Sequence, residues 1–490
     1  MMSKKTKNID KIRRHGQVWT PSWVADAMVS YIMSNSPESI LDPAVGEGVF
    51  LLSARRVSSS VRLIGYEIDE SVLFVARGNG LVDNDLTSIK TVDFLADIDQ
   101  LTPEMMVDAV VANPPYIRHH MIEKTVKDRL LRYSEKVIGT RLDGRSGLHL
   151  YFLIRALQML KSGGRLAFIL PSDVFDGVSS PTLWKWIANN FKIDAVITFS
   201  SEATPFSGVD TNAVVVLIQN DKPSRQFVWA RCMESESTAL FDFVSSGFSE
   251  TNGIYSEVRS IDEALATGIS RKRRTNTETC RLLSEFADVI RGIATGDNDF
   301  FFLSRDEVSR LEIDEVFFKR AIGRTRDLPE SSCEITIDDI EAIDLSGRPT
   351  YLLSIESSDS VNASPAVLNY IRHGEDLGLP QKPLLSSRRP WYRMEKRLPP
   401  DFLFAYLGRK NIRFIKNTAK VVPLSCFLCV YAKSGVNKDV LFSALSDQRT
   451  IENLAYVGKS YGNNSIKVEP KSLLRLEIPE DLLANIYSKD

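Results

Sequence analysis

Short apolar runs alternate with helical stretches over about the first 220 residues of the chain. Runs rich in Val, Ile, Leu and Ala are typical of strands that are buried on both faces of a parallel sheet. The longer stretches between them suit crossover helices. The strands that this pattern predicts are residues 39–43, 63–68, 88–94, 109–112, 165–170, 195–199 and 213–219.

The pattern changes twice further along the chain. Residues 221–280 are more polar and end in a cationic run at 271–274, which favours a connection between domains. From about residue 281 the strict alternation of strands and helices fades, so we expect a second domain there. The sequence therefore predicts a first domain at 1–220, a connecting segment at 221–280 and a second domain at 281–490.

Composition sets few limits on function. The chain has 490 residues, 43% of them hydrophobic and 25% charged, and a formal net charge of −2. These values are ordinary for a globular protein of two or three domains. No apolar run approaches the ~20 residues of a membrane helix, and the basic N-terminus lacks the apolar segment of a secretory signal.

The five cysteines are scattered and odd in number, which favours a reducing compartment and a cytoplasmic protein. Cys426 and Cys429 have the spacing of a metal-binding pair, but they fall in an apolar run and no second pair follows. We interpret them as residues of a buried strand and expect no metal site.

The tetrapeptide Asn113-Pro114-Pro115-Tyr116 directly follows an apolar run. The two prolines fix the backbone and remove two donors, so the carbonyl groups around Pro114 are held as acceptors. Asn113 adds a side-chain acceptor, and Tyr116 offers a ring face for stacking. An amino group on a heteroaromatic ring, such as N6 of adenine, needs two acceptors and a stacking partner. The alternative is a proline-rich turn that only ends a strand.

A glycine-rich turn follows the first predicted strand. Gly46 and Gly48 permit a tight turn and a close backbone approach at the start of a helix. The second strand ends near Glu67, about 20 residues further on, where a carboxylate can accept hydrogen bonds from both hydroxyls of a ribose. Taken singly, the turn also fits an ordinary strand–helix connection, and Glu67 also fits an ordinary surface acid.

The third predicted strand ends in Asp93 and Phe94. The carboxylate can accept a hydrogen bond from an adenine amino group while the ring packs against the base. Four successive strands are thus followed by the glycine turn, an acid, an acid–aromatic pair and Asn-Pro-Pro-Tyr. Open α/β sheets bind ligands at the carboxyl ends of their strands, so this order predicts a ligand site at that edge.

This order of motifs resembles that of the gamma-type, Taq-like N6-adenine DNA methyltransferases of restriction–modification systems. The likeness covers about residues 16–220 and, more loosely, the C-terminal half. It implies an α/β fold: a Rossmann-like class I methyltransferase domain with a seven-stranded, mostly parallel sheet, and a separate C-terminal α+β target-recognition domain. It also implies S-adenosylmethionine as cofactor, transfer to N6 of an adenine flipped out of double-stranded DNA, and a cognate restriction endonuclease on a separate chain as a candidate partner.

The resemblance assigns roles to individual residues. Thr20 is expected near the methionine part of the cofactor, next to Trp19, which replaces the family's frequent tyrosine. Phe206 matches the aromatic residue that stacks on the flipped base, and its polar loop predicts partial exposure. For Phe152, a place in the core of a helix is the alternative. The expected cofactor-binding residues are Thr20, Asp42, Ala44, Gly46, Glu67, Asp93, Phe94 and Phe152. The expected catalytic residues are Asn113, Pro114, Pro115, Tyr116 and Phe206.

Residues 381–420 carry eleven Lys or Arg residues against two acids, Glu395 and Asp401. A local charge of +9 interleaved with aromatic residues is typical of a nucleic-acid-binding surface. A basic face that is paired with acids elsewhere is the alternative. The interleaved aromatic residues are Trp391, Tyr392, Phe402, Phe404, Tyr406 and Phe414. The candidate DNA-binding residues are Arg388, Arg389, Lys410 and Arg413.

Two other classes of protein stay open. Asn-Pro-Pro-Tyr also occurs in methyltransferases that act on protein glutamine or on RNA, because an amide and an arylamine present the same NH2 group. A catalytically inactive DNA-binding specificity protein is the other alternative. The long basic C-terminal part favours nucleic acid over protein, and the intact Glu67, Asp93 and Asn113 favour an enzyme.

Overall fold

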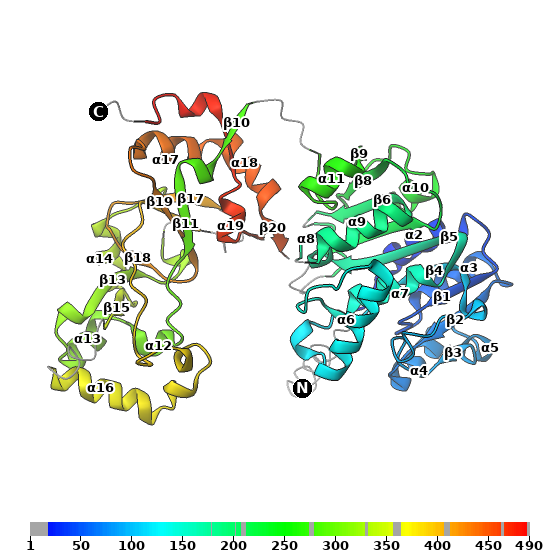
Figure 1. The fold of residues 1–490 in the computed structure, drawn as a ribbon, viewed down its shortest axis with the longest axis horizontal. Coiled ribbons are helices and arrows are strands. Elements are labelled where there is room, and N and C mark those ends of the chain that lie inside the picture. Colours follow the sequence, from blue (N-terminus) through cyan, green and yellow to red (C-terminus); the bar gives the residue numbers. More distant parts are fainter. Residues whose placement is uncertain are drawn as a thin grey trace. The chain divides into compact units, whose positions relative to one another are not determined.

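The protein consists of two compact units, Met1–Thr275 and Asn276–Asp490. The structure, a computed structural model, describes residues 18–487 except 178, 201, 207–211, 274–278, 329–331, 356–363, 406–411 and 462–464. The N-terminal unit has one sheet and the C-terminal unit has several (Figure 1). Each unit also has buried clusters of its own. Each unit therefore has its own core.

The N-terminal unit is built on one nine-stranded sheet. Its strands are β1 (Ser39–Asp42), β2 (Arg62–Tyr66), β3 (Ile89–Lys90), β4 (Val107–Ala112), β5 (Leu160–Pro171), β6 (Lys192–Phe199), β7 (Ala213–Gln219), β8 (Gln226–Cys232) and β9 (Ile254–Ser260). Their order in space is β3-β2-β1-β4-β5-β7-β6-β8-β9. β7 is antiparallel to β5 and β6, and β9 is antiparallel to β8. The other pairs are parallel, which confirms the expected mostly parallel α/β sheet.

The segment expected to connect two domains extends this sheet instead. Within 221–280, β8 pairs in parallel with β6 from Ala195↔Val228 to Phe199↔Cys232, and β9 pairs with β8. The sheet thus has nine strands rather than seven. The two added strands lie at one edge and carry exposed positions, so their sequence is more polar than that of the central strands.

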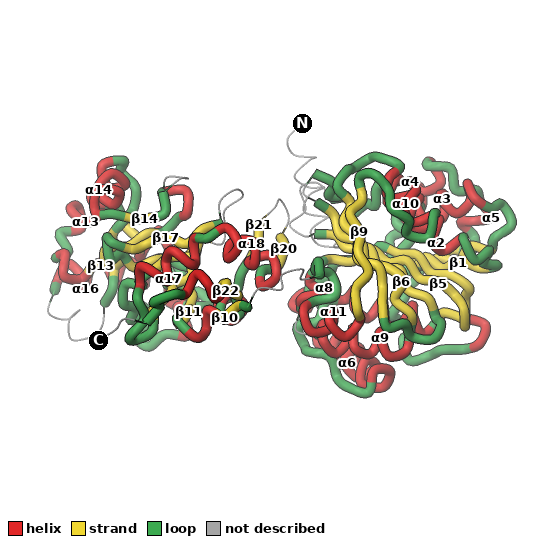
Figure 2. Tube along the Cα trace, turned by 90° about the horizontal axis from the view of Figure 1, so that it is seen from above, coloured by secondary structure: helices red, strands yellow, loops and turns green. Residues whose placement is uncertain are grey.

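Helices cover both faces of the sheet (Figure 2). They are α2 (Ser22–Met33), α3 (Val49–Val57), α4 (Glu70–Gly78), α5 (Asp83–Leu86), α6 (Lys124–Ile138), α7 (Leu148–Gln158), α8 (Asp173–Asp176), α9 (Ser180–Asn190), α10 (Ala239–Ser245) and α11 (Ile261–Thr267). One buried cluster lies under α2, α3 and α10, and a second lies under α6, α7, α9 and α11. Along β4, Ala109 and Val111 join the first cluster while Val110 joins the second, because successive side chains of a strand point to opposite faces.

The carboxyl ends of β1, β2 and β4 lie side by side at one edge of the sheet. In the β1–β2 pair, for example, Asp42 is in register with Gly65. β3 ends at Lys90 and is shorter than the strand expected at 88–94; the chain then turns at Asp93, whose carboxylate accepts a hydrogen bond from the Leu95 amide at 2.8 Å. The loops that follow these strands therefore face a common space.

The C-terminal unit has the α+β fold that the resemblance implied. Its strands are β10 (Cys280–Leu282), β11 (Ala287–Arg291), β12 (Phe302–Leu303), β13 (Phe318–Ile322), β14 (Glu334–Ile335), β15 (Tyr351–Leu353), β16 (Phe402–Ala405), β17 (Arg413–Asn417), β18 (Val422–Pro423), β19 (Phe427–Ala432), β20 (Lys459–Tyr461), β21 (Ser465–Lys467) and β22 (Glu477–Pro479). The helices are α12 (Asn298–Phe301), α13 (Arg305–Leu311), α14 (Ile337–Leu345), α16 (Pro365–Asp376), α17 (Lys438–Ser446), α18 (Gln448–Val457) and α19 (Pro470–Leu473). The two larger sheets have the orders β11-β19-β16-β17-β14 and β12-β15-β13-β18.

Three of the aromatic residues that suggested a nucleic-acid surface belong to the core of this unit. Phe402, Phe404 and Phe414 are at most 1% exposed, and they stand on the neighbouring strands β16 and β17. The interpretation of these three rings as binding residues is wrong, because the apolar face of a sheet produces the same interleaving of aromatic and basic residues as a binding surface. Tyr406 lies outside the described residues.

Among the helices described, none has the length and apolar character that a membrane span requires.

Candidate functional site

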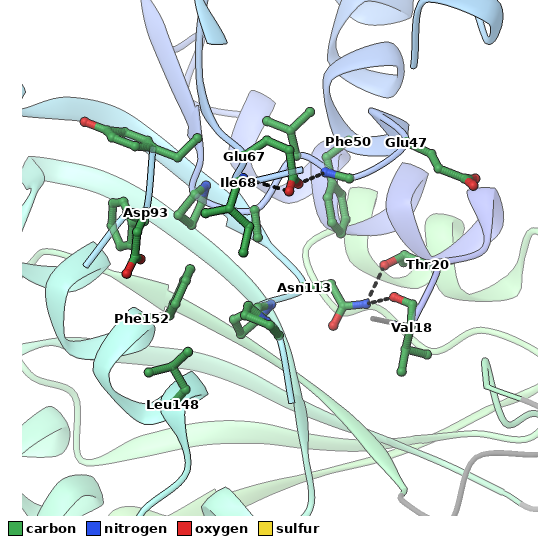
Figure 3. A pocket seen from close by; sticks show the side chains of 18 of the residues that line it. Val18, Thr20, Glu47, Phe50, Glu67, Ile68, Asp93, Asn113, Leu148 and Phe152 are labelled. Atoms are coloured by element: carbon green, nitrogen blue, oxygen red, sulfur yellow. Dashed lines mark hydrogen bonds between the residues drawn. The ribbon is translucent and has the colours of Figure 1, made fainter. Parts of the chain in front are cut away.

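A cavity of about 270 Å³ lies where the loops after β1, β2, β3 and β4 come together (Figure 3). The segment before α2 and the first turns of α3 and α7 complete its wall. The expected site residues that line it are Thr20, Ala44, Gly46, Glu67, Asp93, Phe94, Asn113, Pro114, Pro115 and Phe152. Three expected site residues, Asp42, Tyr116 and Phe206, lie outside this lining. The glycine turn and Asn113 thus share one cavity.

Two glycines with positive φ shape the turn between β1 and α3. Gly46 has a φ of 53° and Gly48 a φ of 81°, a region that residues with a side chain rarely adopt. A Cβ atom at Gly46 would approach the Trp19 ring to 3.0 Å, and one at Gly48 would approach Leu81 to 2.7 Å. Both positions therefore require glycine, for conformation and for space.

Glu67, directly after β2, is held by three backbone amides. Its Oε2 accepts a hydrogen bond from Gly46 at 2.9 Å, and its Oε1 accepts from Ile68 at 2.8 Å and from Asp69 at 2.9 Å. Figure 3 shows the Glu67 carboxylate and hydrogen bonds that it accepts. A carboxylate oxygen can accept two hydrogen bonds, so Oε2 retains one acceptor position toward the cavity.

Asp42 ends β1 and is fully buried behind the turn. Its Oδ1 accepts a hydrogen bond from the Ala44 amide at 3.0 Å, whereas Oδ2 has no hydrogen-bond partner among the described residues. Burial raises the pKa of Asp42 to about 8; the hydrogen bond from Ala44 opposes this rise, and the Glu67 carboxylate adds to it. Asp42 is therefore an anchor of the turn, largely protonated at neutral pH.

Aromatic rings form one end of the cavity. The Phe94 ring lies 5.2 Å from the Tyr66 ring, edge to face, and 5.2 Å from the Phe152 ring, centroid to centroid. The exposed Asp93 lines the same end. Behind the rings, the buried guanidinium of Arg155 lies 5.0 Å from the centroid of Phe94, and burial lowers the pKa of this arginine. A hydrogen-bond acceptor, Asp93, and several aromatic rings thus lie at the same end of the cavity.

At the other end, the NH2 group of Asn113 donates two hydrogen bonds. One goes to the Val18 carbonyl at 2.7 Å and the other to Thr20 Oγ1 at 3.0 Å (Figure 3). These bonds fix the orientation of the amide and direct Oδ1 away from the N-terminal segment, residues 18–20. The buried Oδ1 atom accepts no hydrogen bond from the described part of the chain. Pro114 and Pro115 line the cavity beside it.

Tyr116 and Phe206 pack against each other. Their ring centroids are 6.3 Å apart and their planes meet at 72°, an edge-to-face contact. Phe206 is only 4% exposed, so the expected partial exposure is wrong: the ring packs into the buried cluster that also contains residues of α2. Burial, with the Asp173 carboxylate adding to it, raises the pKa of the Tyr116 hydroxyl well above its usual range.

The two rings do not form a sandwich for a planar base. A base stacked between two rings requires nearly parallel planes about 7 Å apart, because each contact takes about 3.5 Å. The rings of Tyr116 and Phe206 are closer than that and are strongly inclined. The two rings as they stand therefore leave no room for a base between them.

The candidate DNA-binding residues of the C-terminal unit differ in their surroundings. Arg388 is partly buried and donates hydrogen bonds to the carbonyl groups of Ala294 at 2.5 Å and Thr295 at 2.9 Å. Burial lowers the pKa of Arg388. These contacts give Arg388 a structural role in joining two loops. Ion pairs hold three further cations of this stretch: Lys382–Asp297, Arg397–Glu395 and Lys416–Asp439.

Arg389 is exposed, and its hydrogen bonds go to the carbonyl groups of Ser386 and Arg388 in its own loop. Arg413 is partly buried in β17 and donates from Nε to the Ser332 carbonyl at 2.8 Å. Lys410 lies outside the described residues. Of the three that are described, Arg389 is the most accessible to a ligand.

Sequence reasoning missed several residues of the site. Tyr66 lines the cavity and supports Phe94, and its place directly before Glu67 at a strand end was an available signal. Ile117 and Leu148 line the cavity as well. His149 is buried, with its ring centroid 5.9 Å from that of Tyr116. Only the fold reveals this contact, because a single histidine near the start of a helix carries no spacing signal.

The chain matches two protein families that together span nearly all of it. Residues 2–240 match the N-6 DNA Methylase family, and residues 270–490 match the C-terminal domain of the type II methyltransferase M.Eco57I. Both matches are to DNA methyltransferases, and the chain is an enzyme of this class, of the type found in restriction–modification systems. The resemblance inferred from the order of motifs is confirmed.

Full-length relatives agree with this assignment. The chain is 24% identical to the type II methyltransferase M.AccI of Acinetobacter calcoaceticus, over 96% of this chain and 86% of that protein. It is 23% identical to the type II methyltransferase M.XamI of Xanthomonas campestris pv. amaranthicola, over 97% and 86%. Among solved structures, the type IIL restriction–modification enzyme MmeI in complex with DNA superposes with a TM-score of 0.58 at 14% identity. That match covers 88% of this chain but 60% of MmeI, and it supports the fold alone.

Proposed function

We propose that this protein is a site-specific DNA methyltransferase that transfers a methyl group from S-adenosylmethionine to N6 of an adenine flipped out of double-stranded DNA. The observation that carries the proposal is the Asn113 side chain. Its NH2 group is tied to Val18 and Thr20, and its buried Oδ1 is left as a directed acceptor in the cavity. A buried acceptor without a partner is costly, so we infer that it serves a ligand.

The cavity suits the proposed cofactor along its length. Glu67 Oε2 would accept a hydrogen bond from a ribose hydroxyl, and Asp93 would accept one from the adenine amino group while Phe94 and Phe152 pack on the base. Thr20 lies near the other end, beside Asn113. When bound there, S-adenosylmethionine supplies a methyl group on a positively charged sulfur, which requires no metal for activation.

The chain's own contribution to the chemistry is to raise the nucleophilicity of N6. The lone pair of this nitrogen is delocalised into the ring, so the amine is a weak nucleophile. Acceptance of its two N–H bonds by Asn113 Oδ1 and the Pro114 carbonyl favours a pyramidal nitrogen and stabilises the positive charge that develops on it. The surplus proton leaves N6 for water once the new N–C bond has formed.

The acceptors cannot reach N6 inside a duplex, so the adenine must leave the stack. Tyr116 follows Asn113 by three positions and would stack on one face of the base, and Phe206 would cover the other after it separates from Tyr116. Aromatic stacking contributes about 1–3 kcal/mol per base. The C-terminal unit, with Arg389 exposed, would contact the DNA outside the target base.

Transfer of tritiated methyl groups to unmodified genomic DNA tests this proposal, with identification of the labelled nucleoside by mass spectrometry. We expect N6-methyladenine as the product. Asn113→Ala should slow transfer at least about 100-fold, a typical cost of losing one group that stabilises transition-state charge, while affinity for S-adenosylhomocysteine stays within about twofold. Asn35→Ala, which removes an exposed asparagine remote from the cavity lining, is the matched control.

Two results would contradict the proposal. One is label in RNA or in protein glutamine with none in DNA, which would support the alternative substrates that Asn-Pro-Pro-Tyr permits. The other is a loss of cofactor affinity in Asn113→Ala as large as the loss of rate, which would place Asn113 in cofactor binding alone.

A restriction endonuclease with the same recognition sequence is the partner we propose, and resistance of the methylated DNA to such an enzyme checks it.

A further inference from the structure

His149 occupies a closely defined place at the start of α7. The residue is 2% exposed. The ring lies directly on the backbone of Gly147, where an added Cβ atom would come within 2.4 Å of His149 Cε1. No larger residue fits at 147 without displacing the ring. The backbone of Gly147 therefore restricts the position of the imidazole ring.

Among the described residues, the rings of His149 and Phe206 contact Tyr116. The His149 and Tyr116 centroids are 5.9 Å apart with planes at 75°, and the Tyr116 and Phe206 centroids are 6.3 Å apart. His149 comes from a helix of the core, whereas Phe206 comes from a loop. If one contact must open to admit a base, the loop contact is the one that can open without unpacking a helix. The Tyr116 ring would then keep its contact with His149.

The polar atoms of His149 are arranged unusually for a core residue. Both ring nitrogens are buried and have no hydrogen-bond partner among the described residues. Nε2 lies 3.5 Å from Oδ1 of Asp173, at the start of α8, and the two atoms form no hydrogen bond. Buried polar groups without partners destabilise a fold, so an apolar residue would be the better choice for packing alone. A histidine here indicates a task beyond filling space.

We propose that His149 is a positioning residue that holds the Tyr116 ring in the plane required for stacking on the target base, and that Asp173 orients the His149 ring for this task. The inference rests on the proposed function of the site. A small tilt of Tyr116 would move the amino group of the base away from Asn113 Oδ1. Misplacement of a reacting group by about 1 Å can slow a reaction about 100-fold. Loss of the contact between His149 and Tyr116 should therefore have a measurable effect on rate.

The test compares single-turnover transfer of tritiated methyl groups to unmodified genomic DNA at saturating DNA and cofactor. His149→Ala and His149→Asn should slow the reaction about 10- to 100-fold, with affinity for S-adenosylhomocysteine within about twofold of the wild type. Leu153→Ala truncates another fully buried residue of α7 and is the control for lost helix packing. It should lower the melting temperature at least as much as His149→Ala and leave the rate nearly unchanged.

A double-mutant cycle with Asp173→Asn adds a measurement that a purely structural role would not move. Asp173→Asn should slow the wild-type reaction but should not slow His149→Asn any further, because the carboxylate acts through the imidazole. Independent, multiplicative effects would overturn the role of Asp173. Wild-type rates in His149→Ala, or equal slowing by Leu153→Ala, would overturn the role of His149. Absence of transfer to DNA by the wild type would instead overturn the proposed function itself.

Discussion

The side-chain oxygen of Thr20 accepts a 3.0 Å hydrogen bond from the amide of Asn113. Ninety-three positions separate the two residues in the chain, and this bond joins the N-terminal segment to the tetrapeptide after β4. The same amide donates to the Val18 carbonyl, so the segment holds both of its hydrogens. The orientation of the proposed acceptor Oδ1 thus depends on a part of the chain that also lines the cavity.

Thr20→Val should test this link, because valine keeps the shape of threonine and removes the acceptor. Asn113 would then keep one of its two anchors. We expect a turnover number about three- to tenfold lower, since a hydrogen bond contributes about 0.5–1.5 kcal/mol. Thr20→Ser retains the hydroxyl and should keep most of the activity. Steady-state kinetics on genomic DNA measures the change, and a normal turnover number in Thr20→Val would show that Val18 alone suffices.

Asp42 makes the stability of the N-terminal unit depend on pH. Its pKa in the folded protein is about 8, above the ordinary value of 3.8, because the carboxyl group is fully buried. The folded protein therefore binds this proton more tightly than the unfolded chain. The contribution of Asp42 to the free energy of unfolding is fully present below pH 4 and is lost as the pH rises through about 8.

Asp42→Asn removes this titration and keeps an uncharged group of the same shape. We expect the melting temperature of the variant to fall less steeply than that of the wild type between pH 6 and 9, by at least a few degrees over this range. Asp262→Asn, at an exposed position of α11, is the control. Parallel curves for Asp42→Asn and the wild type would show that the carboxyl group is ionised throughout.

The central sheet could be predicted from the sequence, whereas its edge could not. Strands such as β4 and β7 are buried on both faces, so they form continuous apolar runs that a reader of the sequence can recognise. β8 and β9 expose part of their residues, and this mixed pattern is the same as that of a polar connection. The sequence predicted that Glu67, Asp93 and Asn113 lie at the ends of neighbouring strands, and all three line one cavity.

Side-chain burial in loops and mixed segments was the harder part. Phe206 lies in a polar loop, yet its ring packs into the core, because loop composition does not tell which way one ring points. Arg388 and Phe402 come from the same basic and aromatic stretch. One binds carbonyl groups and the other fills a sheet, and only the pairing of strands decides this.

The contrast between Arg388 and Arg389 yields a prediction about DNA binding. Arg388→Met removes two hydrogen bonds to loop carbonyls and should destabilise the C-terminal unit by about 1–3 kcal/mol. Arg389→Ala should leave its stability unchanged, weaken DNA binding, and reduce the slope of log affinity against log salt by about 0.9 if one phosphate contact is lost. Thermal unfolding and DNA binding over a salt series separate the two effects. An unchanged salt slope in Arg389→Ala would remove this residue from the interface.

Phe206 allows a direct test of base flipping once the recognition sequence has been determined by methylation-aware sequencing. Removal of the ring deletes one stacking face, which contributes about 1–3 kcal/mol to holding an extruded base. The loss should be larger for a paired adenine than for an adenine opposite an abasic site, because the latter requires less energy to leave the stack. Phe206→Tyr keeps the ring and should behave like the wild type. Equal losses on the two substrates in Phe206→Ala would mean that the ring, which is 4% exposed, serves only to pack the core.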